Sequence, residues 1–455
     1  MLRLSYEKRV FTVVMIMIAA FAISGIFTGC SPKKSEEGNA DNVSSVNQQT
    51  LSTASPNEEK KPYNIKMWMF PLGDSNKQNE MFEGIVKQFQ NQNPDISVNI
   101  QTMPWSNREQ KLMTALAANR GPDIMYMNTD ILLQFASNNM IIPLDKYVTD
   151  EQKNDFYDFT LKVNSYDGKI YGIPVLQEMM GYFYNLDILK DIGMTKDNLP
   201  STFDEYEAML KNLKEKGKYG TFIDVSGSLV TNGFYAQLWS EGGMPLAMDG
   251  KVTINNDAGK KVLDRFTKWY QEGYMPKDTI TMTEYATGKF ISGETASCYL
   301  SAMTLVNDDF KKVNFNWAIG PQLKGSAGAK THSAIGTFCI TKDSKDPDST
   351  YKWIEYVTNK ESLAAINKFA GCLAPRKSVP NMHADVKGYD VIMSQLDSAY
   401  SVASHPAERQ IMPILIPEIQ AAMLGRKTSE QALNDAAKGA EEVIKKFEDI
   451  RSAQQ

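Results

Sequence analysis

The fold class is decided by residues 65–100, which read IKMWMFPLGDSNKQNEMFEGIVKQFQNQNPDISVNI. The apolar run at 65–68 is typical of a short buried strand, and after a Pro-Leu-Gly-Asp turn the apolar side chains recur at helical spacing. This helical stripe consists of Met81, Phe82, Ile85, Val86 and Phe89. Asn93 and Pro94 end the helix, and residues 96–100 then alternate between apolar and polar as a second strand. The order strand, helix, strand predicts an α/β unit with a parallel sheet.

The same alternation continues towards the C-terminus. Residues 108–118 have the pattern of a helix, and residues 123–127 follow as an apolar strand. A second α/β region begins near Ile173, where residues 181–185 are predicted to form a strand. The chain therefore predicts two regions in which helices cover sheets.

Two helix starts carry capping signals. Thr202 and Glu205 have the spacing of a capping box for a helix that runs to Lys216. Thr428 precedes the last helix, whose apolar stripe continues to Phe447. We therefore expect helices to begin just after residues 202 and 428.

The N-terminus predicts export. Arg3, Lys8 and Arg9 precede an apolar run at 10–27, and small residues lead to Cys30. The segment resembles a bacterial lipoprotein signal, in which the cysteine becomes the lipid-carrying N-terminus, although Phe27 replaces the usual aliphatic residue. We predict a signal peptide at 1–29. The alternative is a transmembrane helix, because about 18 apolar residues barely span a bilayer.

Composition bounds the rest of the chain. Residues 30–62 hold almost no large apolar side chains after Cys30 and predict a flexible linker. The body from 63 to 455 is too long for one ordinary core and favours two lobes. The formal net charge is −5, so no basic surplus indicates a nucleic-acid partner. Function is therefore expected outside the cytoplasmic membrane.

The remaining cysteines are Cys298, Cys339 and Cys372. Their odd number allows at most one disulfide and leaves a free thiol. Each lies among apolar or small residues, so we expect buried, reduced, structural cysteines. One disulfide bridge is the alternative.

Six short motifs in register carry a family resemblance. They are GPDI at 121–124, GKIYGIP at 168–174, YNLD at 184–187, GETA at 293–296, SKDP at 344–347 and GRKT at 425–428. With them the chain resembles the extracellular solute-binding proteins of ABC importers, of the large type that includes the maltose-binding protein. The resemblance covers nearly all of residues 63–455.

The resemblance implies an α/β, type II periplasmic-binding-protein-like fold with two lobes, an interlobe cleft and hinge crossings. Lobe 1 is expected at 63–174 plus 317–357, and lobe 2 at 175–316 plus 358–455. The first crossing is expected near 171–175, the second near 314–319, and the third after the helix at 351–357. A solute held between two hinged lobes shifts the population towards closure.

The implied function is a substrate-binding lipoprotein, not an enzyme, that captures a sugar or oligosaccharide and delivers it to the permease subunits of an ABC importer. No cofactor and no metal are expected, and such receptors are usually monomers. The protein would be lipid-anchored to the cell membrane and face the extracellular side or the periplasm.

A sugar site needs flat apolar surfaces together with hydrogen-bonding side chains at fixed positions. Asp130 follows the strand at 123–127, and the ends of parallel strands open onto clefts in α/β sheets. It matches a family position that holds sugar hydroxyls. Glu178, just past the first crossing, matches an acidic contact.

Weaker candidates for ligand contact follow from the same resemblance, with core or solvent positions as their alternatives. They are Trp68, Asn232, Tyr235, Trp239, Tyr299, Met303 and Arg376. Met303 stands where the maltose-binding pattern has a stacking tryptophan, and Met412 replaces a further expected aromatic. Tyr299 would supply an aromatic ring in place of that tryptophan. These departures weaken the case for maltodextrin in particular.

Other function classes have less support. The histidines His332, His383 and His405 are widely separated and lack metal-ligand spacing. The stretch at 325–331 lacks the glycine spacing of a phosphate loop. Asp130 and Glu178 are a conceivable glycosidase pair. The alternatives kept are a receptor for a peptide or polyamine, and an exported carbohydrate-active enzyme or adhesin.

Overall fold

The computed structural model describes residues 62–225, 230–247, 249–281, 286–401 and 405–454. Cys30 and the predicted signal peptide lie outside these residues. Within them, every helix is too short or too polar to cross a bilayer.

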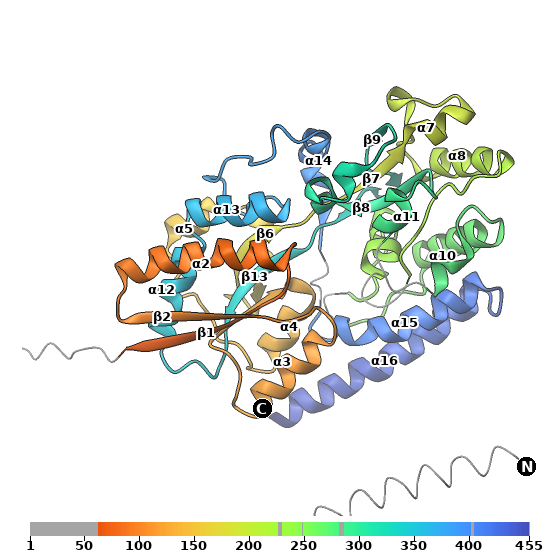
Figure 1. The fold of residues 1–455 in the computed structure, drawn as a ribbon. Helices are drawn as coiled ribbons and strands as arrows, with labels where there is room; N and C mark the ends of the chain where they lie inside the picture. Colours follow the sequence, from red (N-terminus) through yellow and green to blue (C-terminus); the bar gives the residue numbers. More distant parts are fainter. Residues whose placement is uncertain (1–61, 226–229, 248, 282–285, 402–404, 455) are drawn as a thin grey trace, which may run out of the picture. The chain divides into compact units, whose positions relative to one another are not determined.

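A five-stranded sheet organises the first half of the structure (Figure 1). Its order is β2-β1-β3-β13-β6, with the bounds β1 Tyr63–Met69, β2 Ile96–Thr102, β3 Ile124–Asn128, β6 Ile173–Gln177 and β13 Ile335–Ile340. β1 pairs in parallel with β2 and β3, as predicted. β13 runs antiparallel to both β3 and β6, so the sheet is mixed. The predicted parallel order thus holds for the three strands nearest the N-terminus.

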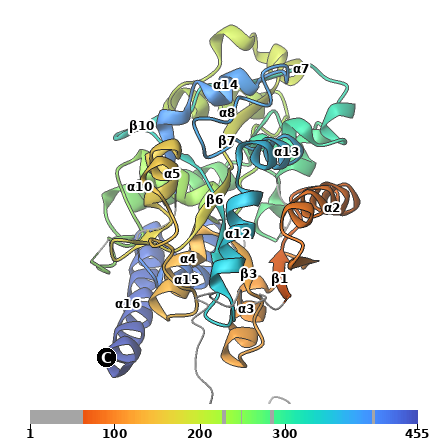
Figure 2. The same ribbon diagram turned by 90° about the vertical axis from the view of Figure 1, so that its left-hand side faces the viewer.

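Helices cover both faces of this sheet (Figures 1 and 2). One face carries three helices that contact one another, with the bounds α2 Ser75–Gln92, α12 Pro347–Val357 and α13 Lys360–Ala370. The other carries α3 Arg108–Ala117 and α4 Thr129–Ser137. In α2 the predicted stripe faces inward, because Phe82, Ile85 and Phe89 are buried while Met81 and Val86 are half-buried. These buried residues belong to a hydrophobic cluster between the helices and the sheet, which we call the first core and which also holds Trp353.

A three-stranded sheet of order β8-β7-β9 organises the second half. Its strands are β7 Met180–Asn185, β8 Ser297–Ser301 and β9 Trp317–Ile319. The helices that pack with it into a second core are α8 Phe203–Glu215, α9 Ala236–Ser240, α10 Asp257–Gln271, α15 Glu408–Met423 and α16 Ser429–Gln454. Both views show α15 and α16 side by side (Figures 1 and 2). Tyr182 and Tyr184 enter this core, whereas Phe183 enters a smaller third core on the other face of β7.

Short elements connect these layers. They are α5 Asp150–Asp155, α6 Asp158–Lys162, β4 Ser165–Tyr166, β5 Lys169–Ile170, α7 Leu186–Leu189, the π-helix η4 Thr231–Tyr235, α11 Thr287–Ile291, η6 Ala302–Val306, β10 Lys324–Gly325, β11 Gly328–Ala329, β12 Thr331–His332, α14 Tyr389–Met393 and β14 Ala399–Tyr400. β12 pairs with β14, so the strand that leads into the first sheet is held beside the segment that leads into α15.

Local signals placed the helix starts correctly. The Thr202 hydroxyl accepts from the Glu205 backbone N–H at 3.2 Å, and Glu205 returns a bond to the Thr202 N–H, which confirms the capping box. Thr428 and Gln431 make the same reciprocal pair at the start of α16. Both caps satisfy helix N–H groups that have no partner within the helix.

Two elements lie on the other side of the lobe bounds expected from the sequence. β9 was expected in lobe 1, but it pairs with β7 in the second sheet. α13 was expected in lobe 2, but Leu363, Ile366 and Ala370 pack into the first core. The cause is that the chain crosses between the halves later than predicted, just before β13 and after α13. The remaining lobe bounds stay a prediction.

The three described cysteines are buried and free. Cys298 lies in the third core, and Cys339 and Cys372 in the first. Burial raises the pKa of Cys298 to about 12, which keeps the thiol protonated and unreactive. They therefore act as small core residues, as the sequence predicted.

Candidate functional site

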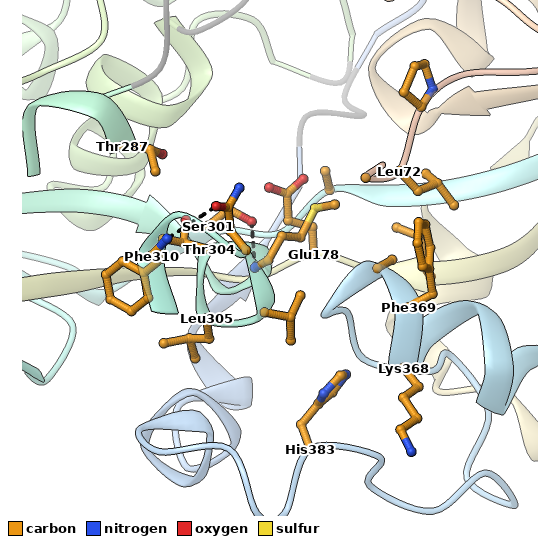
Figure 3. Close-up of a pocket in the computed structure, with 18 of the residues that line it drawn as sticks. Leu72, Glu178, Thr287, Ser301, Thr304, Leu305, Phe310, Lys368, Phe369 and His383 are labelled. Carbon is orange, nitrogen blue, oxygen red and sulfur yellow. Dashed lines mark hydrogen bonds between the residues drawn. The ribbon is translucent and has the colours of Figure 1, made fainter. Parts of the chain in front are cut away.

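A pocket of about 1240 Å³ opens where the two halves of the structure meet (Figure 3). Its lining comes from both sheets and from the segments that join them. Figure 3 shows Glu178 in the middle of the pocket, between Ser301 on one wall and Leu72 and Phe369 on the other. We call this pocket the cleft. Its volume exceeds the range of about 300–1,000 Å³ for drug-sized ligands, so it has room for an extended solute.

Asp130 reaches the cleft from the first turn of α4, directly after β3 ends. One carboxylate oxygen, Oδ2, accepts from Arg108 Nη2 at 2.9 Å and lies 3.5 Å from Arg409 Nη1. The other oxygen, Oδ1, is buried without a hydrogen-bond partner among the described residues. An unsatisfied buried acceptor is costly, so this oxygen is ready to accept from a bound hydroxyl.

Arg409 joins the two halves beside Asp130. It lies on α15, in the second core, and its Nε is 3.4 Å from Glu109 Oε2 on α3. Nearby, the hydroxyls of Thr129 and Ser401 are 3.1 Å apart. These polar contacts link the two halves beside Asp130.

Glu178 lies in the link between β6 and β7. Its backbone N–H donates to Ala334 at 2.8 Å, and its carbonyl accepts from Ser333 at 2.9 Å. Burial raises the pKa of the Glu178 carboxyl, while a hydrogen bond with Ser301 acts in the opposite direction. A carboxyl with a raised pKa takes up a proton more readily and can then donate as well as accept.

His332, at the end of β12, was not expected in the cleft, because the histidines were considered only for a metal site, which their spacing did not support. Its backbone N–H donates to the Tyr299 hydroxyl at 2.9 Å. Burial lowers the pKa of the imidazole to about 4, so the ring is neutral near pH 7. A neutral imidazole offers one donor and one acceptor.

Apolar surface comes from residues of both halves. Met303 and Phe369 line the cleft, and Trp105 stacks on Phe70 with ring centroids 4.8 Å apart. The Arg108 guanidinium lies 5.1 Å from the Trp105 ring centroid, and the Trp105 N–H donates to Pro71 at 2.8 Å. The sequence analysis missed Trp105, although its position just after β2 parallels that of Asp130 after β3.

Of the predicted contacts, Asp130, Glu178, Asn232 and Met303 line the cleft together. Tyr299 lies one layer behind, where its hydroxyl is 2.5 Å from that of Thr331.

Besides Tyr299, four predicted contacts do not line the cleft. Trp68 packs half-buried against the first core, because strand alternation places it opposite Met67. Tyr235 and Trp239 are buried in the second core with ring centroids 5.9 Å apart. Arg376 covers the Phe156 ring at 4.6 Å and lies 3.8 Å from Asp155.

The described residues contain no cluster of metal-ligating side chains. Among the described residues, no three His, Cys, Asp or Glu side chains converge in a way that would hold an ion.

The sequence of this chain is similar to a protein family and to several known proteins. Residues 84–391 match the family described as bacterial extracellular solute-binding protein. A Brucella abortus protein that bears the name of a binding protein is 25% identical over 372 residues, which are 80% of this chain and 90% of that protein. The maltodextrin-binding protein MdxE of Bacillus subtilis is 23% identical over 382 residues, which are 80% of this chain and 88% of that protein.

Among solved structures, an ABC substrate-binding protein from Listeria monocytogenes in complex with cycloalternan superimposes with a TM-score of 0.74. The match covers 84% of this chain and 99% of that chain at 20% identity. This likeness confirms the predicted α/β fold with two lobes.

The cleft histidine generates a pH prediction. Because the pKa of His332 is about 4 in the folded protein and about 6.5 in an unfolded chain, the unfolded state gains its proton first as pH falls. The free energy of unfolding therefore decreases between pH 6.5 and 4, by on the order of 2 kcal/mol from this residue. Urea titrations at pH 7.5 and 4.5 should show a smaller loss of stability on acidification for His332→Asn than for wild type. Parallel losses in the two proteins would contradict the assignment.

Proposed function

The chain belongs to the family of bacterial extracellular solute-binding proteins, and we propose that it captures a sugar or oligosaccharide in the cleft and delivers it to the permease of an ABC importer. The family resemblance inferred from the six motifs is thereby confirmed. Relatives named for maltodextrin and galactooligosaccharide binding support a carbohydrate as the ligand class.

The observation that carries the proposal is the combination of polar groups in the cleft. Asp130 presents a buried oxygen without a partner, Glu178 is a carboxyl with a raised pKa, and Met303 adds apolar surface. A sugar has hydroxyl groups around an apolar ring face. Its hydroxyls can donate to Asp130 and exchange hydrogen bonds with Glu178, and its ring face can pack on Met303. Charge-assisted hydrogen bonds to a carboxylate are the stronger kind.

A polyamine fits this cleft less well. A site for a polycation needs several carboxylates that no protein cation already neutralises. Here Arg108 lines the cleft and, together with Arg409, pairs with Asp130. The arginines therefore disfavour a polyamine at Asp130 and favour a hydroxyl-rich solute there.

A glycosidase is the alternative from another class, with Asp130 and Glu178 as its two carboxyl groups. We propose binding without catalysis, because the family consists of solute receptors. A thermal-shift screen over mono- and oligosaccharides tests the proposal, since a ligand bound only by the native state raises the melting temperature. Saturable binding with no released reducing ends is expected. Released reducing ends would favour the enzyme, and no response to any sugar would contradict the proposal.

Removing either cleft carboxyl should weaken sugar binding. We expect Asp130→Ala and Glu178→Ala each to reduce affinity by about 1–3 kcal/mol for the sugar that gives the largest thermal shift, measured by calorimetric titration. Asp130→Asn removes the charge but keeps the side-chain volume beside Arg108, so comparing it with Asp130→Ala separates the two effects on affinity.

Asp158→Ala is the matched control, because this aspartate is fully exposed and does not line the cleft. It should bind as wild type does. Wild-type affinity in both cleft variants, with unchanged circular dichroism, would remove these carboxyl groups from the site.

We also propose that Cys30 carries a lipid that anchors the protein to the outer face of the cell membrane, and that the protein acts as a monomer. The support is the basic start, the apolar run and the small residues before Cys30.

Cys30→Ser should move the protein from the membrane fraction to the soluble or secreted fraction, because one thioether-linked lipid anchor is lost. Immunoblots of fractionated cells check this. Retention of the variant in membranes would indicate a transmembrane anchor at residues 10–27.

A further inference from the structure

A second, smaller cavity lies beside the cleft, between the three-stranded sheet and the helices of the second core. Its volume is about 20 Å³, which is enough for one water-sized group. Asn232 lines both this cavity and the cleft, so the two spaces share a wall. We call this space the side cavity.

Among the described residues, Asp224 is the one carboxyl group in the wall of the side cavity. Its side chain is 6% exposed, and its Oδ1 has no hydrogen-bond partner in the described part of the chain. The carboxyl accepts a backbone hydrogen bond from Ala286, and burial raises its pKa to about 7. Among the ion pairs of the described residues, none includes Asp224.

Three other polar side chains of the wall, those of Tyr206, Thr221 and Gln237, already have partners. The Tyr206 hydroxyl lies 2.7 Å from that of Thr221 and 2.6 Å from that of Ser297. Gln237 Oε1 accepts from Arg265 at 2.9 Å. Asp224 Oδ1, in contrast, is a buried acceptor without a partner among the described residues, so it can accept from an incoming donor.

The π-helical turn η4 packs closely against the backbone of Asp224. Asn232 lies in the π-helical turn Thr231–Tyr235, a conformation that is rare and occurs frequently at functional sites. A Cβ on Gly233 would lie 2.4 Å from the carbonyl oxygen of Asp224, so glycine is required for this close approach. The turn that carries Asn232 thus packs directly on Asp224 and keeps the side cavity adjacent to the cleft.

We propose that the side cavity is a subsite of the cleft that receives one hydrogen-bond-donating group of the bound sugar, a hydroxyl or an amino group, with Asp224 Oδ1 as its acceptor. The inference rests on the proposed function, because it needs a sugar in the cleft. An ammonium group would also supply the positive charge that Asp224 lacks, so the subsite favours amino sugars over their neutral counterparts.

The test is calorimetric titration at pH 7.5 with glucose, glucosamine, maltotriose and the trisaccharide of glucosamine. Asp224→Ala should weaken every probe that wild type binds by about tenfold or more. Asp224→Asn keeps an acceptor oxygen but no charge, so it should hold neutral sugars within a few-fold and lose about tenfold or more for the amino sugars.

Tyr184→Phe is the matched control. It also removes a buried polar atom without a partner, from a residue that lines neither cavity, and it should leave all affinities unchanged. If Asp224→Ala does not fold, Asp224→Asn decides the question for the amino sugars.

Three results would overturn the inference. Affinities of Asp224→Ala within twofold of wild type for every probe, or amino-sugar affinities of Asp224→Asn within twofold of wild type, would overturn the subsite alone and leave the proposed function intact. A crystal structure with a bound probe that shows only a resident water beside Asp224 would do the same. If no probe and no sugar of the thermal-shift panel binds the wild-type protein, the proposed function fails and the subsite with it.

Discussion

The placement of β13 is the constraint on which the rest of the structure depends. This strand comes late in the chain, yet it fills the position between β3 and β6 in the first sheet. In its register Gly336 lies opposite Asn128 on one side and Leu176 on the other. Asp130 and Glu178 each follow two residues later, so a single strand brings both carboxyl groups to the same edge. The glycine is required there, because a Cβ would lie 1.9 Å from the buried Tyr126 hydroxyl.

The position of β13 in the first sheet, although it follows the strands of the second sheet in the chain, also explains why the structure has two halves. The chain must leave the first sheet, build the second, and come back, and the polar linking segments then meet at the strand ends. Those segments supply Glu178 and His332, while Arg409 links the two halves through its contacts with Asp130 and Glu109. The cleft therefore combines a carboxylate held by guanidinium groups with Glu178, whose carboxyl pKa is raised by burial, and with His332, whose pKa of about 4 leaves the ring neutral near pH 7. This mixture of acceptors and donors suits a neutral, hydroxyl-rich ligand.

Sequence reasoning recovered what is encoded locally. The stripe of α2, the Thr202 and Thr428 caps and the first three strands depend on residues close in the chain, and all were predicted. Asp130 and Glu178 were found through strand ends and family motifs. The sheet assignment of β9 was missed because pairing with β7 joins residues more than 130 positions apart. Trp68 was misplaced towards the cleft, since strand alternation directs it to the opposite side from Met67. His332 gave no local signal, because its role depends on where β12 is held.

The central claim is that two hinged halves close around a carbohydrate. Small-angle X-ray scattering tests it most directly, with and without a saturating concentration of the sugar that gives the largest thermal shift. The account predicts a smaller radius of gyration in the bound state, because the solute contacts both halves only when they close. Superimposable curves for the free and the saturated protein would contradict it.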